Sequence, residues 1–594
     1  MTKHFQMATR LVAIAGTLGL SACGDPPAAD GEDPATEPPA AQPGSPPAVA
    51  EPAALEGFAR EDLREDPGRA AWQTEIFNEA ASGQLKKLAA TIADSPVLEA
   101  KSLAKFVGEG FTTGSLHPDR PPAGATGAEG FAAALNELLG GENAAEFKIV
   151  SVQPGEDRVH TEILASLASR KDGKSWQANA RWKAAWTMAD DGPPKLLALE
   201  VPAEGFTFHE RATADPMFSD QTAAVLAGNR SYPLQLVHGI DHWMERMEAA
   251  YGMDLVGNHG VAVADVNGDG LDDVYFCQAG GLPNRLFLGQ PDGTARDVSA
   301  EAGVDFCDYS RAAIFVDLDN DGDQDLAVLL NATVVILAND GTGSFSAGNR
   351  YPIIGNATAL SSADYDDDRL LDLYVVVRDA ELGVLGNRLL GSPIPYHDAN
   401  NGGPNVMLRN EGGLAFRAVT GETGLDRNNR RFSQAAAWED YDNDGDQDLY
   451  VANDFGRNNL YRNDGGQFTD VAAAAGVEDL SAGMSVSWAD YNRDGRMDLY
   501  VGNMFSSAGN RVTYQRQFKD GIADDLRGLY QRHARGNSLF ESVDGGTFRD
   551  VSLETGVTMG RWAWSSVFAD LDNDGWEDLV VANGFVTNED THDL

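Results

Sequence analysis

The sequence is poor in cysteine, in positive charge and in long hydrophobic runs. Only three of its 594 residues are cysteines, which excludes a disulfide-rich scaffold. Asp and Glu outnumber Lys and Arg by 91 to 45, and the resulting net charge of −46 argues against a nucleic-acid partner. No stretch beyond the N-terminal segment is apolar enough to span a membrane. The hydrophobic fraction of 42% is nevertheless ordinary for a globular protein of two or three domains.

Signatures of catalysis are also missing. The chain has no G-x-S-x-G nucleophile turn and no C-x-x-C-H haem site, and its only Gly-Lys pair lacks the upstream glycine of a phosphate-binding loop. His238 and His242 are spaced to share a helix face, but the glutamate of a zinc-protease helix is absent between them. Surface or capping roles are therefore favoured for both histidines. We predict that the protein is not an enzyme.

Residues 1–23 predict export. Lys3 and Arg10 flank a short apolar run over residues 11–20, and the segment ends in the sequence LSAC at residues 20–23. This ending resembles the bacterial lipoprotein signal, in which the cysteine carries the lipid. The resemblance implies lipidation of Cys23 and a periplasmic or cell-surface protein whose only membrane contact is the N-terminal lipid anchor. A plain signal peptide is the alternative.

The remaining cysteines, Cys277 and Cys307, would then lie in an oxidising compartment. A disulfide between them and a pair of buried free thiols are both compatible with the sequence.

Composition divides the rest of the chain into four segments. Residues 24–56 are rich in Pro and Ala and predict a disordered linker, because they contain almost no large apolar residues. Residues 57–205 predict an α+β domain, with helices over 72–90 and 127–139 and extended segments over 147–152, 159–168, 176–188 and 195–201. This order of elements is similar to the cone-shaped fold of the nuclear transport factor type. Residues 206–254 form a connector, and residues 255–594 are repetitive.

The repeated unit is an apolar strand, the loop D-x-[DN]-x-D-G-x-x-D and a second apolar strand. Six copies begin at the following aspartates: Asp265, Asp317, Asp364, Asp440, Asp490 and Asp570. Oxygen ligands at positions 1, 3, 5 and 9, with glycine at position 6 for the bend, form the kind of cage that Ca²⁺ prefers. Position 12 holds an apolar strand residue instead of the glutamate of an EF-hand, so that alternative fails. One such loop could be a simple acidic turn, but six in one register predict calcium sites.

We expect calcium in five of the six loops. The predicted ligands are Asp265, Asn267, Asp269, Asp273; Asp317, Asp319, Asp321, Asp325; Asp440, Asp442, Asp444, Asp448; Asp490, Asn492, Asp494, Asp498; and Asp570, Asp572, Asp574, Asp578. In the third loop Arg369 stands where glycine is expected, so the bend would be strained and a guanidinium would lie beside the cage. The metal assignment of Asp364, Asp366, Asp368 and Asp372 is therefore left open.

A second half-motif follows most loops, as in NNLYRNDGGQFTDVAAAAGV from Asn458 and NSLFESVDGGTFRDVSLETGV from Asn537. Two strands around the loop and two around the glycine turn give the four strands of a propeller blade. Loop and tail together resemble the FG-GAP/VCBS repeat proteins, in particular bacterial relatives of cartilage acidic protein, and the loops are similar to those of integrin α-subunits. The resemblance covers residues 255–594 and implies a seven-bladed β-propeller with calcium on one face and a role in recognition or adhesion.

The expected fold is thus mainly β: a calcium-binding β-propeller with six visible repeat cores, preceded by a small α+β domain. The last core lacks a glycine-turn half, so either residues 206–210 supply a strand that closes the ring or the sequence is part of a longer chain, which the resemblance favours.

We expect an extracytoplasmic recognition, adhesion or scaffold module for an unidentified protein or glycan, since loops on a rigid scaffold commonly carry recognition. The insertions over 380–404 and 504–535 would offer the variable surface. The second insertion is basic and could contact an acidic partner or balance local charge; its cations are Arg511, Arg516, Lys519, Arg527, Arg532 and Arg535. The alternatives are a propeller lyase or hydrolase acting on extracellular polysaccharide, and a purely structural envelope protein.

Overall fold

The computed structural model describes residues 73–119, 126–188, 192–203, 206–211, 218–239, 242–243, 245–247, 259–379, 398–515, 518–519, 521–544 and 546–584. The predicted signal with Cys23, the linker and most of the first insertion lie outside the described residues. No helix among the described residues is both long and apolar enough to cross a membrane.

The N-terminal part is an α+β sheet, as the sequence predicts. Its central strands are β2 (Glu142–Pro154), β3 (Val159–Lys171) and β4 (Lys174–Trp186), which pair antiparallel in chain order. The sheet continues through β5 (Leu196–Glu200) to β1 (Val107–Thr113), and β1 pairs with β5 in parallel. Buried residues alternate along β3, so one face of the sheet packs against a core.

Three helices cover this core: α1 (Gln73–Ala93), α2 (Ala100–Leu103) and α3 (Gly127–Leu138). The apolar residues of α1 recur every three or four positions, so one stripe of the helix is buried. Phe77 at its N-terminal end meets Trp186 edge-on, with ring centroids 6.3 Å apart. Phe131 of α3 is fully buried in the same core.

The strand that was one candidate to close the propeller belongs to this sheet instead. Residues 207–211 form β6 (Thr207–Arg211), which pairs antiparallel with β4 from Asn179 to Ser175. Of the two alternatives that the sequence left open, the one in which residues 206–210 complete a blade is therefore wrong. The N-terminal part of β4 has a free edge, because β5 pairs only with its C-terminal part. This edge offers backbone hydrogen bonds to residues 207–211, so they pair with β4.

The connector contains α4 (Thr222–Leu226) and a short π-helical turn, η2 (Tyr232–Leu236). Its side chains hold the first repeat: Asn229 Nδ2 donates to the carbonyl of Ala295 at 2.7 Å, and Gln235 Nε2 donates to that of Pro283 at 2.9 Å.

Five four-stranded antiparallel sheets and one two-stranded sheet follow within the described residues. The first two sheets consist of β7 (Val261–Ala264), β8 (Asp273–Phe276), β9 (Arg285–Gly289) and β10 (Ala295–Asp297), and of β11 (Ser310–Val316), β12 (Asp325–Leu330), β13 (Thr333–Asn339) and β14 (Phe345–Pro352). The third and fourth consist of β15 (Asn356–Ala363), β16 (Asp372–Asp379), β17 (Val406–Asn410) and β18 (Phe416–Ala418), and of β19 (Ser433–Glu439), β20 (Asp448–Asn453), β21 (Asn459–Asn463) and β22 (Phe468–Asp470). The last two consist of β23 (Gly483–Ala489), β24 (Asp498–Asn503), β25 (Ser538–Asp544) and β26 (Thr547–Asp550), and of β27 (Ala563–Ala569) and β28 (Asp578–Asn583).

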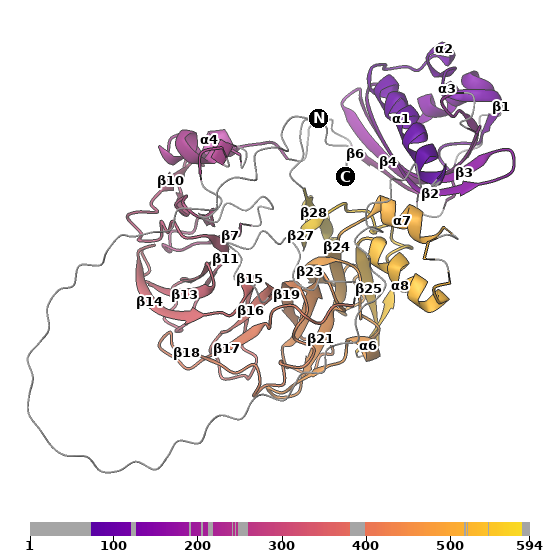
Figure 1. Ribbon diagram of the computed structural model, residues 1–594. Helices are drawn as coiled ribbons and strands as arrows, with labels where there is room; N and C mark the ends of the chain where they lie inside the picture. Colours follow the sequence, from indigo (N-terminus) through magenta and orange to yellow (C-terminus); the bar gives the residue numbers. More distant parts are fainter. Residues whose placement is uncertain are drawn as a thin grey trace, which may run out of the picture. The chain divides into compact units, whose positions relative to one another are not determined.

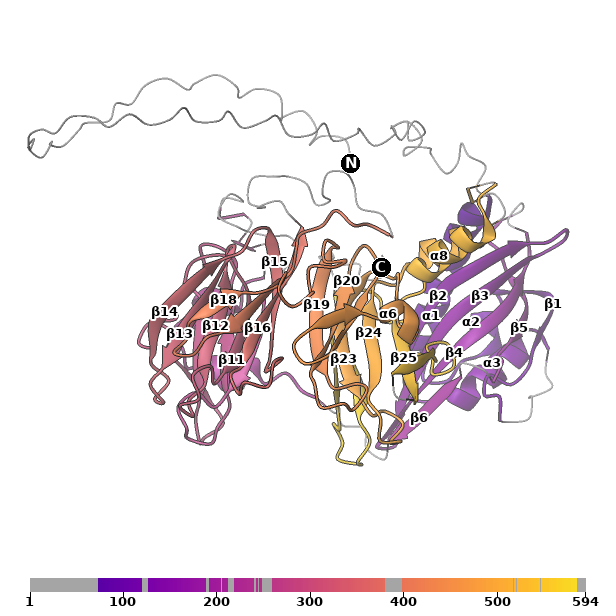
Figure 2. The same ribbon diagram turned by 90° about the horizontal axis from the view of Figure 1, so that it is seen from below.

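These sheets are blade-like. The first strand of each sheet contacts the first strand of the next, from β7 through β27, so the sheets follow one another in chain order (Figure 1). Within a sheet, strands such as β11 to β14 lie side by side in chain order (Figure 2). The second strands β12, β20 and β24 are buried at every residue, because neighbouring sheets cover both of their faces.

Candidate metal centres

Each acidic loop joins the first and second strands of a sheet in one repeated turn. In the fourth loop the Asp440 carboxylate accepts the backbone N–H of Asp444 at 3.0 Å and of Gly445 at 3.1 Å. Asp444 in turn accepts the N–H of Asp446 at 3.0 Å. The contact between the first aspartate and the residue at position 6 recurs in every loop, with Gly270, Gly322, Arg369, Gly495 and Gly575 as donors.

Position 6 requires a left-handed backbone. Gly445 has φ +100°, and nothing lies within 4 Å of the position that a Cβ would take there. Arg369 occupies the same position in the third loop with φ +71°, a conformation that is unfavourable for a residue with a Cβ. The strained bend predicted for this loop is confirmed.

In the first five loops position 9 is a buried carboxylate that ties the loop to the third strand, whereas Asp578 of the sixth loop is exposed. Asp448 is 1% exposed, and its Oδ1 accepts the backbone N–H of Asn463 at 2.7 Å. The same contact joins Asp273 to Gly289, Asp325 to Asn339, Asp372 to Asn410 and Asp498 to Ser542. Burial raises the pKa of these carboxyls: to about 6 for Asp325, about 7 for Asp372 and Asp498, and about 8 for Asp448. Burial thus makes the ionised form of these carboxyls unfavourable, and a bound cation would offset that cost.

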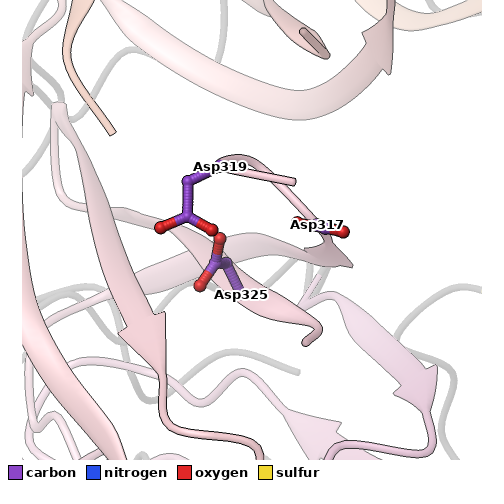
Figure 3. Close-up of side chains that lie close together, drawn as sticks. All are labelled: Asp317, Asp319 and Asp325. Carbon is purple, nitrogen blue, oxygen red and sulfur yellow. The ribbon is translucent and has the colours of Figure 1, made fainter. Parts of the chain in front are cut away.

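In four loops three carboxylates converge, with oxygens that all lie within 4.8 Å of one another. Figure 3 shows Asp319 and Asp325 of the second loop with their carboxylates side by side and Asp317 close to them. The other groups are Asp364, Asp366 and Asp372; Asp440, Asp442 and Asp448; and Asp570, Asp572 and Asp574. The third loop thus brings carboxylates together despite its arginine, while Asp578 lies outside the group formed in the last loop.

The first and fifth loops have asparagine at position 3 and hold fewer carboxylates. The side-chain oxygens of Asn267 and Asn492 each accept a backbone N–H at 2.9 Å, from Asp269 and Asp494 respectively. An amide adds an oxygen ligand without charge, so these two loops would hold a cation more weakly than loops with aspartate at that position.

Several buried carboxylate oxygens lack a hydrogen-bond partner. They are Asp317 Oδ1, Asp319 Oδ1, Asp366 Oδ1, Asp442 Oδ1, Asp448 Oδ2 and Asp498 Oδ2. Buried polar atoms are normally paired, because an unpaired carboxylate oxygen loses its hydration without compensation. Their position inside all-oxygen cages fits a hard cation such as Ca²⁺, which accepts six to eight oxygen ligands.

Family comparison places known repeats on the same loops. The FG-GAP-like repeat model matches residues 265–328, 317–375, 440–501 and 519–581. The chain contains FG-GAP-like repeats. Three of the four matched repeats begin at the first aspartate of a loop, and all four end in the second strand of a sheet. The repeat therefore spans the acidic loop and the passage to the following sheet.

Among curated proteins, none matches the sequence. Among solved structures, a lectin from Agrocybe aegerita that recognises non-reducing terminal N-acetylglucosamine is 15% identical, with a TM-score of 0.32 over 56% of this chain and 76% of the lectin. An NTF-2 like protein from Silicibacter pomeroyi is 9% identical, with a TM-score of 0.17 over 23% of this chain and 98% of its own. TM-scores of this size do not establish a shared fold, so the cone-shaped fold of the N-terminal part stays a prediction.

The basic insertion uses most of its charge inside the protein. It contains α7 (Ser507–Thr513) and α8 (Asp524–Ala534). Arg511 pairs with Glu75 at 2.8 Å, and its side chain is 9% exposed. Arg532 binds Asp479 at 3.0 Å, and Arg535 binds Asp550 at 2.9 Å. Arg527 donates to the carbonyl of Gln515, and Lys519 to the hydroxyl of Tyr530, while Arg516 lies outside the described residues. Internal charge balance therefore describes this insertion better than a docking surface for an acidic partner.

The cysteines and histidines form no metal site among the described residues. Cys277 and Cys307 are free thiols, so the disulfide, one of the two alternatives that the sequence left open, is not formed. Cys277 is buried but Cys307 is exposed, which agrees only in part with two buried thiols. The rings of His238 and His242 stack with centroids 3.8 Å apart, and no third ligand in the described part of the chain completes a group with them.

Sequence reasoning missed the side chains that surround the loops. Asn339, Asn410 and Asn463 end the third strands of three sheets. Their Nδ2 groups donate at 2.8 Å to the carbonyl at position 2 of the preceding loop, which belongs to Val266, Leu318 and Tyr365 respectively. The recurrent asparagine in the sequences ILAN, LRN and YRN was the available signal. Arg409, which lies beside the third loop, has no such signal.

Proposed function

We propose that residues 255–594 form a calcium-stabilised β-propeller that serves as a recognition or adhesion module. The observation that carries the proposal is the repeated acidic cage, in which buried carboxylate oxygens lack any hydrogen-bond donor. Carboxylates held this close repel one another strongly unless a cation lies between them. Calcium would therefore supply part of the free energy of folding of each blade-like sheet.

The blade-like sheets and their chain of first-strand contacts support the propeller geometry, and the resemblance implies seven blades. The acidic cages would fix one end of each strand pair, while the loops at the other end could vary in sequence. Variable loops on a rigid scaffold commonly form binding surfaces. A catalytic role has less support, because calcium would hold the aspartates ionised and coordinated, away from proton transfer.

The sequence of residues 1–23 supports an extracytoplasmic location for this module. A lipid on Cys23 would tether it to a membrane, and the Pro- and Ala-rich segment 24–56 would act as a spacer. Extracellular and periplasmic calcium can fill weak sites that cytosolic calcium would leave empty.

Metal content and stability test the calcium role. Purified protein should retain calcium after desalting, and chelation should lower its melting temperature, with calcium restoring it and an equal concentration of magnesium failing to do so. Asp442→Asn gives the fourth loop the asparagine that the first and fifth loops carry at position 3, so it should weaken calcium binding at one site. Asp292→Asn is the matched control, since it removes one charge from an exposed turn outside the cages. Equal melting temperatures with and without chelator would refute the proposal.

Ligand binding tests the recognition role. A screen of glycans and extracellular proteins, run with calcium and with chelator, should yield a ligand whose affinity is lost on chelation. Turnover of a polysaccharide in the same screen would instead support an enzyme, and calcium-dependent stability without any ligand would support a structural envelope protein.

A further inference from the structure

The third loop differs from the others in holding an arginine from a neighbouring strand against two of its carboxylates. In the fifth loop Arg496, at position 7 of the loop itself, pairs with one carboxylate, that of Asp494, at 2.5 Å. Arg409 lies on β17, and its Nε is 2.9 Å from Asp366 Oδ2, while its Nη2 is 3.2 Å from Asp368 Oδ2. These carboxylates stand at positions 3 and 5, whose oxygens would otherwise face the metal. Arg369, the residue that makes this loop unusual in sequence, contributes its backbone N–H to Asp364 at 2.8 Å. The guanidinium that contacts the carboxylates of this cage is that of Arg409.

The fourth sheet carries an arginine at the equivalent place but directs it elsewhere. Arg462 on β21 pairs with Asp464 at 2.9 Å, outside the fourth cage. The residue equivalent to Asp464 in the third sheet is Glu411, which Arg417 binds at 3.0 Å. Arg417 stands opposite Arg409 across the β17–β18 pair, whereas Thr469 stands opposite Arg462. A neutral residue at position 469 leaves Asp464 available to Arg462.

Competition for one acidic side chain thus decides where each arginine points. In the third sheet Glu411 is occupied by Arg417, and Arg409 turns to the loop. In the fourth sheet Asp464 captures Arg462, and the buried oxygens Asp442 Oδ1 and Asp448 Oδ2 stay without a partner. The third loop keeps a single such oxygen, Asp366 Oδ1, on a carboxylate that Arg409 already holds.

We propose that Arg409 is a built-in counter-ion that takes the place of calcium in the third loop. The proposal rests on the proposed function, since it assigns this loop a different cation from the others. A guanidinium stays charged at all relevant pH values and donates several hydrogen bonds in a fixed plane, so it neutralises two carboxylates permanently. A calcium ion in the same cage would have to displace it, because two cations at this distance repel each other. The wild-type protein therefore binds five calcium ions, one fewer than its number of acidic loops.

Calcium stoichiometry at a buffered free concentration tests the proposal, measured on the full chain by elemental analysis and titration calorimetry. Arg409→Gln should bind one calcium ion more than the wild type. Arg462→Gln, the matched control, should bind the same number as the wild type. An unchanged stoichiometry in Arg409→Gln, or six ions in the wild type, would overturn the proposal and leave the calcium role of the other loops intact.

A second variant keeps Arg409 in place, in case its removal prevents folding. Arg417→Thr frees Glu411, which should then draw Arg409 away from Asp366 and Asp368 as Asp464 draws Arg462. This variant should also gain one calcium ion, and failure to gain it in a protein with native circular dichroism would count against the proposal. Wild-type protein without any bound calcium would instead overturn the proposed function itself.

Discussion

Replacing Asp448 by asparagine should change stability in opposite directions with and without calcium. The carboxylate is buried, accepts the N–H of Asn463 through Oδ1, and leaves Oδ2 facing the cage of Asp440 and Asp442. Asparagine keeps an oxygen for the N–H of Asn463 and has nearly the same shape. It replaces the second carboxylate oxygen by an NH₂ group, which cannot bind a cation but can donate to the neighbouring carboxylates.

With calcium present, the variant should be less stable than the wild type. A site filled at a free calcium concentration one hundred times its dissociation constant contributes about 2.7 kcal/mol. Loss of that site should lower the melting temperature by about 4 °C for a domain of this size.

In chelator the order should reverse at neutral pH and above. Burial raises the pKa of Asp448 to about 8, so ionising it opposes folding when no cation is present. Because the folded-state pKa lies above the unfolded-state value, the contribution of Asp448 to the stability of the metal-free wild type is greatest at acidic pH and is lost as pH rises from about 4 toward 8. Asp448→Asn lacks this contribution and should be more stable than the metal-free wild type by about 1–3 kcal/mol at pH 8.

Chemical denaturation at pH 5 and pH 8, each in calcium and in chelator, gives four free energies of unfolding for each protein. Asp292→Asn should follow the wild type in every condition, since its side chain lies in an exposed turn. A variant that is less stable than the wild type by the same amount with and without calcium would refute the reasoning, because it would show that Asp448 acts through packing and hydrogen bonding alone.

Three further substitutions and one labelling experiment follow from the loops and their surroundings. Gly445→Ala should cost about 1–2 kcal/mol by denaturation, purely from the backbone angle, because no atom blocks the added Cβ. Asn463→Ala removes the donor to the Tyr365 carbonyl and should cost about 3 kcal/mol, whereas Asn463→Asp should restore little, since it replaces a donor by an acceptor. Cys307 should react with a thiol reagent in the native protein, while Cys277, whose thiol pKa burial raises to about 12, should react only after unfolding; equal rates would contradict the structure.

Local patterns in the sequence were sufficient to predict most of the strands. The alternation along β3 and the unbroken apolar runs of β12 and β20 follow directly from which faces are covered. The five residues of β6 are too few to specify a partner, so the choice between a blade and β4 depended on a contact that no local pattern encodes. The pairing partner of such a short strand is decided by which sheet has a free edge within its reach.

The acidic loops were predictable for the same local reason, since their ligands lie within nine residues of one another. The occupant of the third loop was not. Arg409 and Arg462 follow similar sequence, in LRN and YRN, and their different orientations depend on Arg417 and Thr469 across the sheet. Side-chain charge partners of this kind are set by long-range register, which the linear sequence does not display.

The asparagine amides between neighbouring sheets give the array an uneven mechanical strength. Asn339, Asn410 and Asn463 fasten the first four sheets into one continuous hydrogen-bonded unit, loop to strand. At the fifth sheet the corresponding residue is Ser542, whose side chain has no amide to reach the preceding loop. Between the fourth and fifth sheets the loop is therefore held by apolar contacts, such as the stacking of Tyr441 on Trp488, instead of by an amide. This seam should depend more strongly on temperature than the three that asparagines fasten, because apolar contacts weaken on cooling.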